Sequence, residues 1–489
     1  MAALPKITIA ALAGLLAWSA AGASERGRVE FESSNTRLND GFRWAKTQAL
    51  RYVFSGDAAG EWYEASLPGR SAFCMRDVSH QALGAQVLGL APVTRNLLRR
   101  FANSIAGSRQ WCGFWEITKD GLPAPVDYKD DRDFWYNLPA NFDVLHACYR
   151  QYLWTAGETY RNDPIFRTFY RRTTTDYIRA WDADGDGIPD SFPGYGRRGI
   201  GSYFEASDVP LRQGVDLVAA EYAALLAASR MSDSPETAVR LRDRAAKLKR
   251  RLNRDWWDAS TKRFYAGRLQ DGRYSSRAFP EAAVFPLHFE SLPSTPEHRE
   301  GALRALVEAS RDAGINVEAL SYMPEVLFRW GHDDDGYRVL LHLLDPSLPR
   351  REYPEVSFAA VGAIVAGLMG IAPEADHTVA TLAHLTPQTE WAAVRHVPVF
   401  QNEIGLRHQG LGESSLTNER GGVIHWKAVF SRRVAAVKVN GVRRTPRAGE
   451  DAGGRMFHYV LVDVRPGETV TVVSTAGPEK GSSPRVRMP

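Results

Sequence analysis

Carboxylates and aromatic rings occur together at four places in the sequence, and this combination is typical of sugar-binding sites. Aromatic rings stack on the apolar faces of pyranoses, while carboxylates hold hydroxyl groups or move protons. The clusters are Trp62-Tyr63-Glu64 followed by Arg76-Asp77, the stretch with Trp115, Asp127, Trp135 and Tyr136, Tyr203-Phe204-Glu205 followed by Asp208, and Glu352-Tyr353-Pro354-Glu355. Sugar binding or acid–base chemistry on a sugar is therefore the first hypothesis.

Each of these residues also has a purely structural interpretation. Glu355 follows a proline at an expected helix start, where a carboxylate stabilises free N–H groups and the helix dipole. Asp77 could cap a helix in the same way. Glu205 is freer for function, because Ser207 or Asp208 could cap the helix that follows. Histidines such as His80 are more often hydrogen-bonded residues within a helix than groups that bind a substrate or metal.

An acidic loop precedes the third cluster. Asp182, Asp184, Asp186 and Asp190 lie within nine residues, and a glycine at the sixth position matches the first half of an EF-hand loop. The twelfth position is Pro193 rather than the bidentate glutamate. A structural calcium site held by the four aspartates and a tight acidic turn without metal are the two interpretations.

Other chemistry is disfavoured by what the sequence lacks. It has no P-loop, H-E-x-x-H, paired-cysteine or G-x-S-x-G motif, and the GxGxxG match at 194–199 follows an acidic turn rather than a strand. A formal net charge of +4 over 489 residues is too small to indicate non-specific nucleic-acid binding. The three cysteines match no zinc spacing, and one disulfide or three buried thiols are both compatible with them.

The elements that would position these clusters are mainly helices. Apolar residues recur at three- and four-residue spacing in twelve segments between about Leu38 and Ile371. Short and long connections mostly alternate, so six helical hairpins closed into a ring would place the long connections on one rim. The fold class expected is mainly α: an (α/α)6 barrel followed by a small β-sandwich-like domain, in which Asn440-Gly441 signals a hairpin turn.

The expected organisation has five parts. Residues 1–23 read as a signal peptide, with Lys6, an apolar run and the Ala21-Gly22-Ala23 cleavage pattern. They are followed by an N-terminal segment (24–37), the barrel (38–372), the β domain (373–478) and a loose tail (479–489). A strand within Arg28–Glu32 could join the β domain. The mature protein is then periplasmic or secreted, without a membrane span, and nothing in the sequence indicates its oligomeric state.

With these features the chain resembles a known group, the six-hairpin (α/α)6-barrel glycoside hydrolases, which include glucoamylases and α-L-rhamnosidases. Phe73-Cys74-Met75-Arg76-Asp77 looks like the segment that grips the sugar at the cleavage point, and Asp182 to Asp190 looks like a loop common in this clan. Glu205 and Glu355 fall where members carry the general acid and the general base. The Trp-Glu-Glu signature of glucoamylases and the trehalase signatures are absent, so the resemblance extends to the clan and not to one family.

The resemblance implies inverting hydrolysis of a glycosidic bond in an oligo- or polysaccharide, with Glu205 and Glu355 as catalytic residues and no required cofactor. Long connections on the active rim favour a pocket and hence exo action. The substrate-binding residues expected are Trp62, Glu64, Arg76, Asp77, His80, Trp115, Trp135, Tyr136, Asp208 and Arg351. Arg350 and Arg351 beside Glu355 suggest a uronic-acid sugar. Two alternatives stay open: a polysaccharide lyase that uses Tyr136, Asn141, His80 and Arg351, and a glycan-binding protein without activity.

Overall fold

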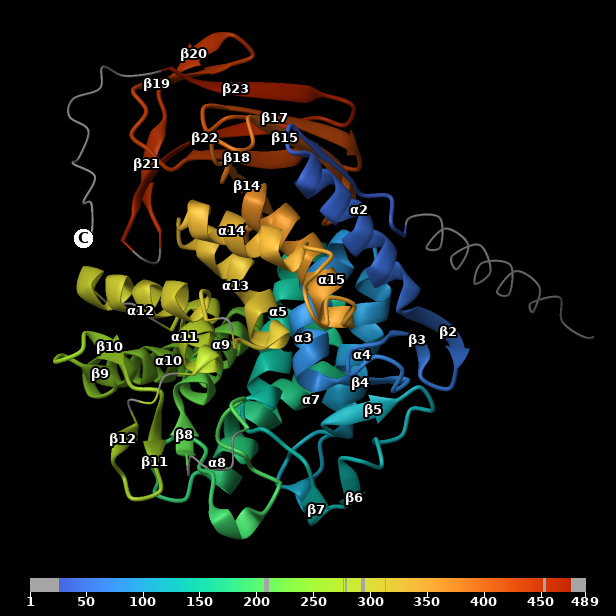
Figure 1. Cartoon of the computed structure of the whole chain (residues 1–489), viewed down its shortest axis with the longest axis vertical. Coiled ribbons are helices and arrows are strands. Elements are labelled where there is room, and N and C mark those ends of the chain that lie inside the picture. Colours follow the sequence, from blue (N-terminus) through green and yellow to red (C-terminus); the bar gives the residue numbers. More distant parts are fainter. Residues whose placement is uncertain are drawn as a thin grey trace, which may run out of the picture.

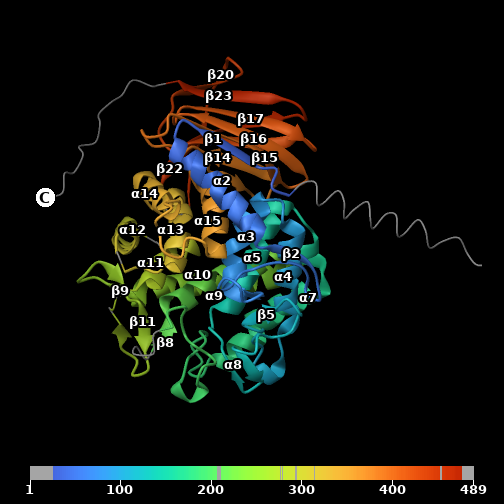
Figure 2. The same ribbon diagram turned by 45° about the vertical axis from the view of Figure 1, so that its right-hand side comes forward.

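The computed structural model describes residues 26–205, 211–275, 277, 279–291, 295–312, 314–451 and 454–475. The expected signal peptide, Asp208 and the tail 479–489 lie outside these residues. Figures 1 and 2 show a helical body with a strand-rich part at one end. This combination of a helical region and a β domain agrees with the sequence prediction.

Six helices form the inner part of the helical body. They are α3 (Met75–Val87), α5 (Ala140–Thr155), α9 (Val215–Met231), α11 (Pro280–His288), α13 (Val317–Arg329) and α15 (Pro354–Gly362). Each packs on the next in this order, and α15 packs back on α3. Their sequences fit this position: every residue of α15 is buried, as expected for a helix that is apolar on all sides.

A second set of helices covers the first. It contains α2 (Thr36–Arg51), α4 (Ala91–Ser104), α7 (Pro164–Arg172), α10 (Pro235–Asp255), α12 (Pro296–Ala309) and α14 (Asp333–Leu343). Five of these pack on inner helices: α2 on α15, α4 on α3, α10 on α9, α12 on α11 and α14 on α13. Shorter segments, α6 (Thr159–Asn162), α8 (Ile178–Trp181) and π-helical turns at Thr173–Tyr177 and Ala363–Leu368, complete the body.

One glycine sets the distance between the first and last inner helices. A Cβ atom on Gly84 of α3 would lie 2.0 Å from the backbone oxygen of Phe358 in α15. The two helices therefore pack backbone against backbone, and only glycine allows this approach.

Two sheets make up the β domain. The larger has the order β1-β15-β16-β17-β23-β19-β20, and the smaller has the order β13-β14-β18-β22-β21. Their bounds are β1 Glu30–Ser33, β13 Ile371–Pro373, β14 Thr378–Leu382, β15 Trp391–Val399, β16 Asn402–Gln409, β17 Glu413–Arg420, β18 Ile424–Phe430, β19 Ala436–Val439, β20 Val442–Arg444, β21 Arg447–Glu450, β22 Met456–Val464 and β23 Thr469–Thr475. The N-terminal strand β1 pairs with β15, as the sequence suggested, and Asn440 and Gly441 turn the chain between β19 and β20 with positive φ angles.

Short strands also occur in the long connections, which the sequence analysis treated as loops. They are β2 (Val53–Asp57) with β3 (Gly60–Tyr63), β4 (Ala72–Cys74) with β5 (Glu116–Thr118), β6 (Tyr128–Asp130) with β7 (Asp133–Phe134), β9 (Trp257–Asp258) with β10 (Arg263–Phe264), and β8 (Leu211–Gly214) with β11 (Gly267–Leu269) and β12 (Tyr274–Ser275). Two of these pairings, β4 with β5 and β8 with β11, join different connections, and such short segments give no local signal in the sequence. The strands β5, β8 and β11 lie on the side of the helical body away from the β domain (Figures 1 and 2).

Two general properties follow from the described residues. Cys74, Cys112 and Cys148 are buried and unpaired, which decides between the two sequence interpretations in favour of thiols. Among the described helices, none combines the length and apolarity needed to cross a bilayer.

Candidate active site

All six inner helices carry a carboxylate in their first turn. These residues are Asp77, Asp143, Asp216, Glu281, Glu318 and Glu355 on α3, α5, α9, α11, α13 and α15. The positive end of a helix dipole favours negative charge there. Dipole stabilisation alone does not account for them, because most are buried, where a carboxylate needs a partner.

Four of the six line one hollow region at this end of the helices. Two adjoining cavities of about 400 and 320 Å³ share Arg76, Glu205, Glu318 and Glu355 in their linings. The first is also lined by Asp77, Trp115, Glu116, Asp127 and Trp135, and the second by Tyr203, Glu281, Phe285, Asn316, Tyr322 and Arg350. Carboxylates and aromatic rings therefore converge on one space, as the sequence clusters suggested.

Glu355 and Asp77 form a carboxyl pair inside this region. Burial, followed by the charge of Asp77, raises the pKa of Glu355 well above its usual value. Burial also raises the pKa of Asp77, although Arg76, whose Nε lies 3.4 Å from Asp77 Oδ1, opposes this. The charge of Asp77 thus favours the protonated form of Glu355. Asp77 lies inside the first turn of α3 and does not cap it, because the cap position is Cys74.

Glu205 lies on a loop that is fixed from both sides. Tyr203, two residues before Glu205, donates its hydroxyl to Asp143 Oδ2 over 3.0 Å and its backbone N–H to Asp216 Oδ2 over 2.6 Å. Asn137 Nδ2 donates to Glu205 Oε1 over 3.1 Å. The Glu205 carboxyl is exposed to solvent. The first-turn carboxylates Asp143 and Asp216, which do not line the cavities, thus position the loop that carries Glu205.

Glu281 and Glu318 are cavity residues that the sequence analysis missed. Burial raises the pKa of Glu281 to about 7, and its buried Oε2 atom has no hydrogen-bond partner among the described residues. Glu318 is paired with Arg350, and its own buried Oε2 is likewise without a partner there. The signal that could have found them is an acidic residue in the first turn of every second helix.

A second carboxyl pair lines the outer part of the cavity. Burial first, and then a hydrogen bond with Asp127, raise the pKa of Glu116 to about 8. Arg70 lies 3.3 Å from Glu116 Oε2. The buried Oδ2 of Asp127 has no hydrogen-bond partner among the described residues. This pair is suited to accept hydrogen bonds from sugar hydroxyls.

Several residues expected at the site lie elsewhere. Trp62 is buried and donates its Nε1 to Asp57 over 2.8 Å, while Glu64 accepts the backbone N–H of Ser71 over 3.0 Å. Neither lines the cavities. Both tie the first long connection together, so we assign them to the support of that connection.

The residues of the lyase alternative are also away from the cavity linings. His80 stacks on Tyr322 with a ring separation of 3.4 Å, and burial lowers its pKa to about 3. Tyr136 is buried and donates to Asn141 Oδ1 over 2.5 Å. The Arg351 guanidinium lies 3.6 Å from the centre of the Trp44 ring. In this arrangement the tyrosine, histidine and arginine do not meet, so the lyase has no assembled site.

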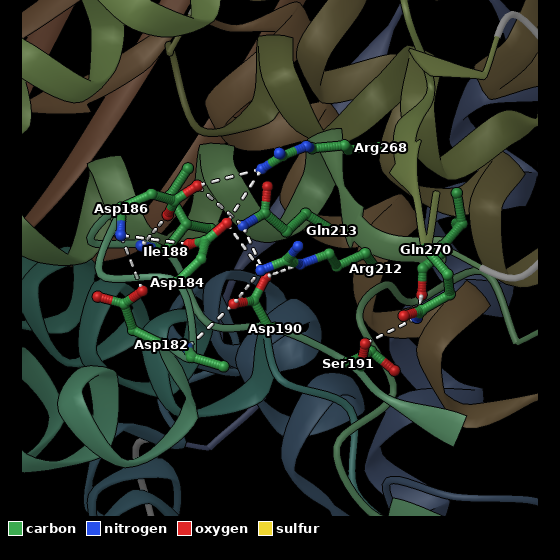
Figure 3. Close-up of polar contacts among 12 residues, drawn as sticks. Asp182, Asp184, Asp186, Ile188, Asp190, Ser191, Arg212, Gln213, Arg268 and Gln270 are labelled. Atoms are coloured by element: carbon green, nitrogen blue, oxygen red, sulfur yellow. Dashed lines mark hydrogen bonds and ion pairs between the residues drawn. The ribbon is translucent and has the colours of Figure 1, made fainter. Parts of the chain in front are cut away.

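The acidic loop meets arginines where a calcium ion would lie (Figure 3). One oxygen each of Asp182, Asp184 and Asp190 come within 4.8 Å of one another, a spacing that a metal could use. However, Arg212 lies 2.7 Å from Asp184 and 2.6 Å from Asp190, and Arg251 lies 2.7 Å from Asp186.

The remaining oxygens of the loop are also engaged. Asp182 accepts backbone N–H groups from Asp186 and Gly187, and the second oxygen of Asp190 accepts from Ala183. Calcium takes six to eight oxygen ligands that are free to coordinate. Arginines therefore supply positive charge where calcium was expected, and the calcium site stays a prediction.

Comparisons with known proteins agree on the fold. No family model matches the sequence, and no curated protein matches it significantly. The structure is similar to the α-L-rhamnosidase from Dictyoglumus thermophilum (TM-score 0.59, 13% identity, 91% of this chain and 50% of that chain). It is also similar to a GH78 family rhamnosidase of Bacillus sp. GL1 (0.57, 14%, 80% and 40%) and to a putative kojibiose phosphorylase from human microbiome (0.56, 8%, 94% and 66%).

These neighbours define the class of the fold. They are six-hairpin glycosidase-like proteins, and the chain has this fold, as the sequence resemblance indicated. The chain spans half or less of the length of the two rhamnosidases. Because the identities are 14% or lower, the comparisons establish the fold and leave the family within it open.

Proposed function

We propose that the protein is an exported glycoside hydrolase and that its helical body is an (α/α)6 barrel with the active site at the N-terminal ends of the inner helices. The observation that carries this proposal is the convergence of Glu205, Glu355 and the Arg76-Asp77 pair with Trp115 and Trp135 on one cavity. Carboxylates for proton transfer and rings for stacking are the groups that glycoside hydrolysis needs. Export rests on the expected signal peptide alone.

In the proposed mechanism, the reaction inverts the anomeric configuration. Glu205 protonates the leaving oxygen from the loop held by Tyr203. Glu355, in its ionised form, accepts a proton from a water molecule on the opposite face of the sugar. Glu281, with its pKa of about 7, accepts a hydrogen bond from a hydroxyl of the bound sugar. Long connections around the cavity favour a pocket, and a pocket favours attack at the chain end.

The charges of the cavity support a neutral sugar rather than the uronic acid that the sequence suggested. Every arginine that lines the two cavities is already paired with a carboxylate of the protein: Arg70 with Glu116, Arg76 with Asp77, Arg197 with Asp133 and Arg350 with Glu318. A sugar carboxylate would have to displace one of these partners and would face the other acids. Sugar hydroxyls, in contrast, can donate to the unpartnered carboxylate oxygens.

The same charge argument supports water rather than phosphate as the acceptor. A phosphorylase must place a phosphate anion beside the sugar, where Glu355, Asp77 and Glu281 would repel it. Because one structural neighbour is a putative kojibiose phosphorylase, the assay should be run with and without phosphate.

A panel of 4-nitrophenyl glycosides, including α-L-rhamnoside, both glucosides and a glucuronide, tests the proposal. We expect release of nitrophenol from a neutral glycoside, without a requirement for phosphate, and a loss of at least about 100-fold in kcat for Glu205→Gln and for Glu355→Gln. The exposed Glu32→Gln is the matched control and should keep full activity. Proton NMR of the first sugar released reports inversion.

Four results would count against parts of the proposal. Cleavage of the glucuronide alone would refute the neutral-sugar argument. Turnover that appears only with phosphate would make the enzyme a phosphorylase. Full activity in both glutamine variants would remove Glu205 and Glu355 from the mechanism, and binding without turnover by the wild type would favour a glycan-binding protein.

A further inference from the structure

A groove of about 420 Å³ lies on the outer helices, apart from the cavities described above. It runs between α7 with the π-helical turn that follows it and α10, and no residue of its lining belongs to the candidate active site. Its volume is in the range of sites that hold small ligands, about 300–1,000 Å³. The groove therefore has the dimensions of a binding site of its own.

The lining of this groove is strongly basic. It contains Arg161, Arg167, Arg171, Arg240 and Arg244, and the one acidic residue in the lining is Asp233. The formal charge of the lining is thus 5 − 1 = +4, as large as that of the whole chain. Such a local concentration of one sign raises the potential in a concave surface and attracts anions.

Ion pairs engage three of these arginines: Arg161 with Glu158 and Asp233, Arg167 with Asp233, and Arg244 with Glu221. Asp233 is shared, since its oxygens lie 2.9 Å from Arg161 and 3.5 Å from Arg167. Arg171 and Arg240 are exposed and form no ion pair with a described residue. Arg171 and Arg240 are therefore the two lining arginines whose guanidinium groups are available to an anion.

The rest of α10 extends the basic surface along the helix. Its sequence Pro235–Asp255 contains eight arginines and lysines against three acidic residues. Arg242, Lys247 and Arg250 are exposed on it, beyond the groove. An elongated ligand with repeated negative charges could therefore contact the groove and continue along α10.

The remaining lining residues indicate which kind of anion fits. Thr168, Thr175, Ser232, Ser234 and Thr237 bring hydroxyl groups to the groove, and it contains no exposed large apolar side chain. A membrane-binding surface presents aromatic or leucine side chains beside its basic residues. Arginines with hydroxyl groups instead match a chain that carries both carboxylates or sulfates and sugar hydroxyls.

We propose that this groove is a second carbohydrate site, which binds an anionic polysaccharide. The proposal goes beyond the proposed hydrolysis and does not depend on it. The catalytic cavity, whose arginines are all paired, is suited to a neutral residue, while the groove takes an acidic segment of a glycan. The two sites together fit a polymer that carries both kinds of sugar.

Binding to polygalacturonate, measured by calorimetry with the wild-type protein, tests the proposal. Dextran sulfate tests whether sulfate replaces carboxylate, and neutral dextran is the negative probe. We expect binding of the polyanions that weakens when salt is raised from about 50 to 200 mM, because the ion pairs are screened. Arg171→Glu/Arg240→Glu should weaken binding at least tenfold, and the milder Arg171→Gln/Arg240→Gln should give a smaller loss.

The control makes the same change in net charge at another place. Arg443→Glu/Arg444→Glu alters two exposed arginines of the β domain and should bind as the wild type does. Equal loss in this control, or no loss in the Arg171/Arg240 variants, would overturn the proposal. Binding of phosphatidylglycerol vesicles but not of polygalacturonate would overturn the choice of ligand. The Arg171/Arg240 variants should keep their activity on nitrophenyl glycosides, so failure here is distinguishable from failure of the proposed hydrolysis.

Discussion

The buried carboxylate Asp143 should make the protein less stable in alkaline solution. Burial raises the pKa of Asp143 from 3.8 to about 7, with Tyr203 as its hydrogen-bond donor. The folded state therefore binds a proton at a pH where the unfolded chain has released it. The stability that depends on this proton is complete below the unfolded pKa and is lost as the pH rises through the folded pKa.

The size of the effect follows from this shift. The change from 3.8 to about 7 corresponds to about 4 kcal/mol over the full titration, at about 1.4 kcal/mol for each pH unit. Between pH 5 and pH 8 the linkage relation gives a loss of about 2–3 kcal/mol from Asp143 alone. Asp143→Asn removes the titration while keeping an oxygen that can accept from Tyr203, so it should abolish this part of the pH dependence.

Urea unfolding followed by tryptophan fluorescence at pH 5 and pH 8 measures the effect as a double difference. We expect the wild type to lose about 2–3 kcal/mol more than Asp143→Asn between the two pH values, whatever the variant's absolute stability. The exposed Asp243→Asn is the matched control and should behave as the wild type does. If Asp143→Asn shows the wild-type pH dependence, the side chain does not hold a proton in the fold, and the reasoning from burial is refuted.

Three further outcomes can be checked by thermal or acid unfolding. Gly84→Ala should lower the free energy of unfolding by about 1–3 kcal/mol, because its Cβ would lie 2.0 Å from the Phe358 oxygen. Gly194→Ala is the control, because a Cβ there meets open space, and equal melting temperatures of the two variants would contradict the close packing at Gly84. Chelation with EDTA should leave the melting temperature of the wild type unchanged, and a chelator-sensitive wild type would show that a metal holds the loop. Arg212→Met should lower the melting temperature, because the buried Asp190 loses its cation at a cost of about 3–5 kcal/mol. His80, with its pKa lowered to about 3, contributes stability that is complete above about pH 6.5 and lost as the pH falls. His80→Gln should therefore shift acid unfolding to lower pH, and an unchanged midpoint would mean that His80 titrates normally.

Much of the fold was predictable because it rests on local patterns. The helix periodicity located the helical region between about Leu38 and Ile371, and the alternation of residues with the Asn440-Gly441 signal located the β domain. The pairs that join distant segments, such as β4 with β5, were not predictable. A three-residue strand forms only through pairing with a strand from a distant segment, and no local sequence pattern indicates which segment that is.

The candidate site shows the same division. Glu205, Glu355, Arg76 and Asp77 could be selected because carboxylates and aromatic rings stand together in the sequence, and all four line the cavity. Trp62, Glu64, His80, Tyr136 and Arg351 matched the same pattern and lie elsewhere. Residue type and loop position were equal in the two groups, so only the direction of each side chain separates them.

The sequence by itself determined the mainly helical fold with its β domain and the residue types of the candidate site: acids and aromatic rings on the long connections, and an acidic turn. Only the tertiary structure decided which charges meet. It placed Asp77 against Glu355, where burial and the charge of Asp77 raise the pKa of Glu355, and it placed Arg212 and Arg251 on the aspartates expected to hold calcium. The physical reason is that Coulomb energy and desolvation depend on distances of a few ångströms between residues far apart in the chain.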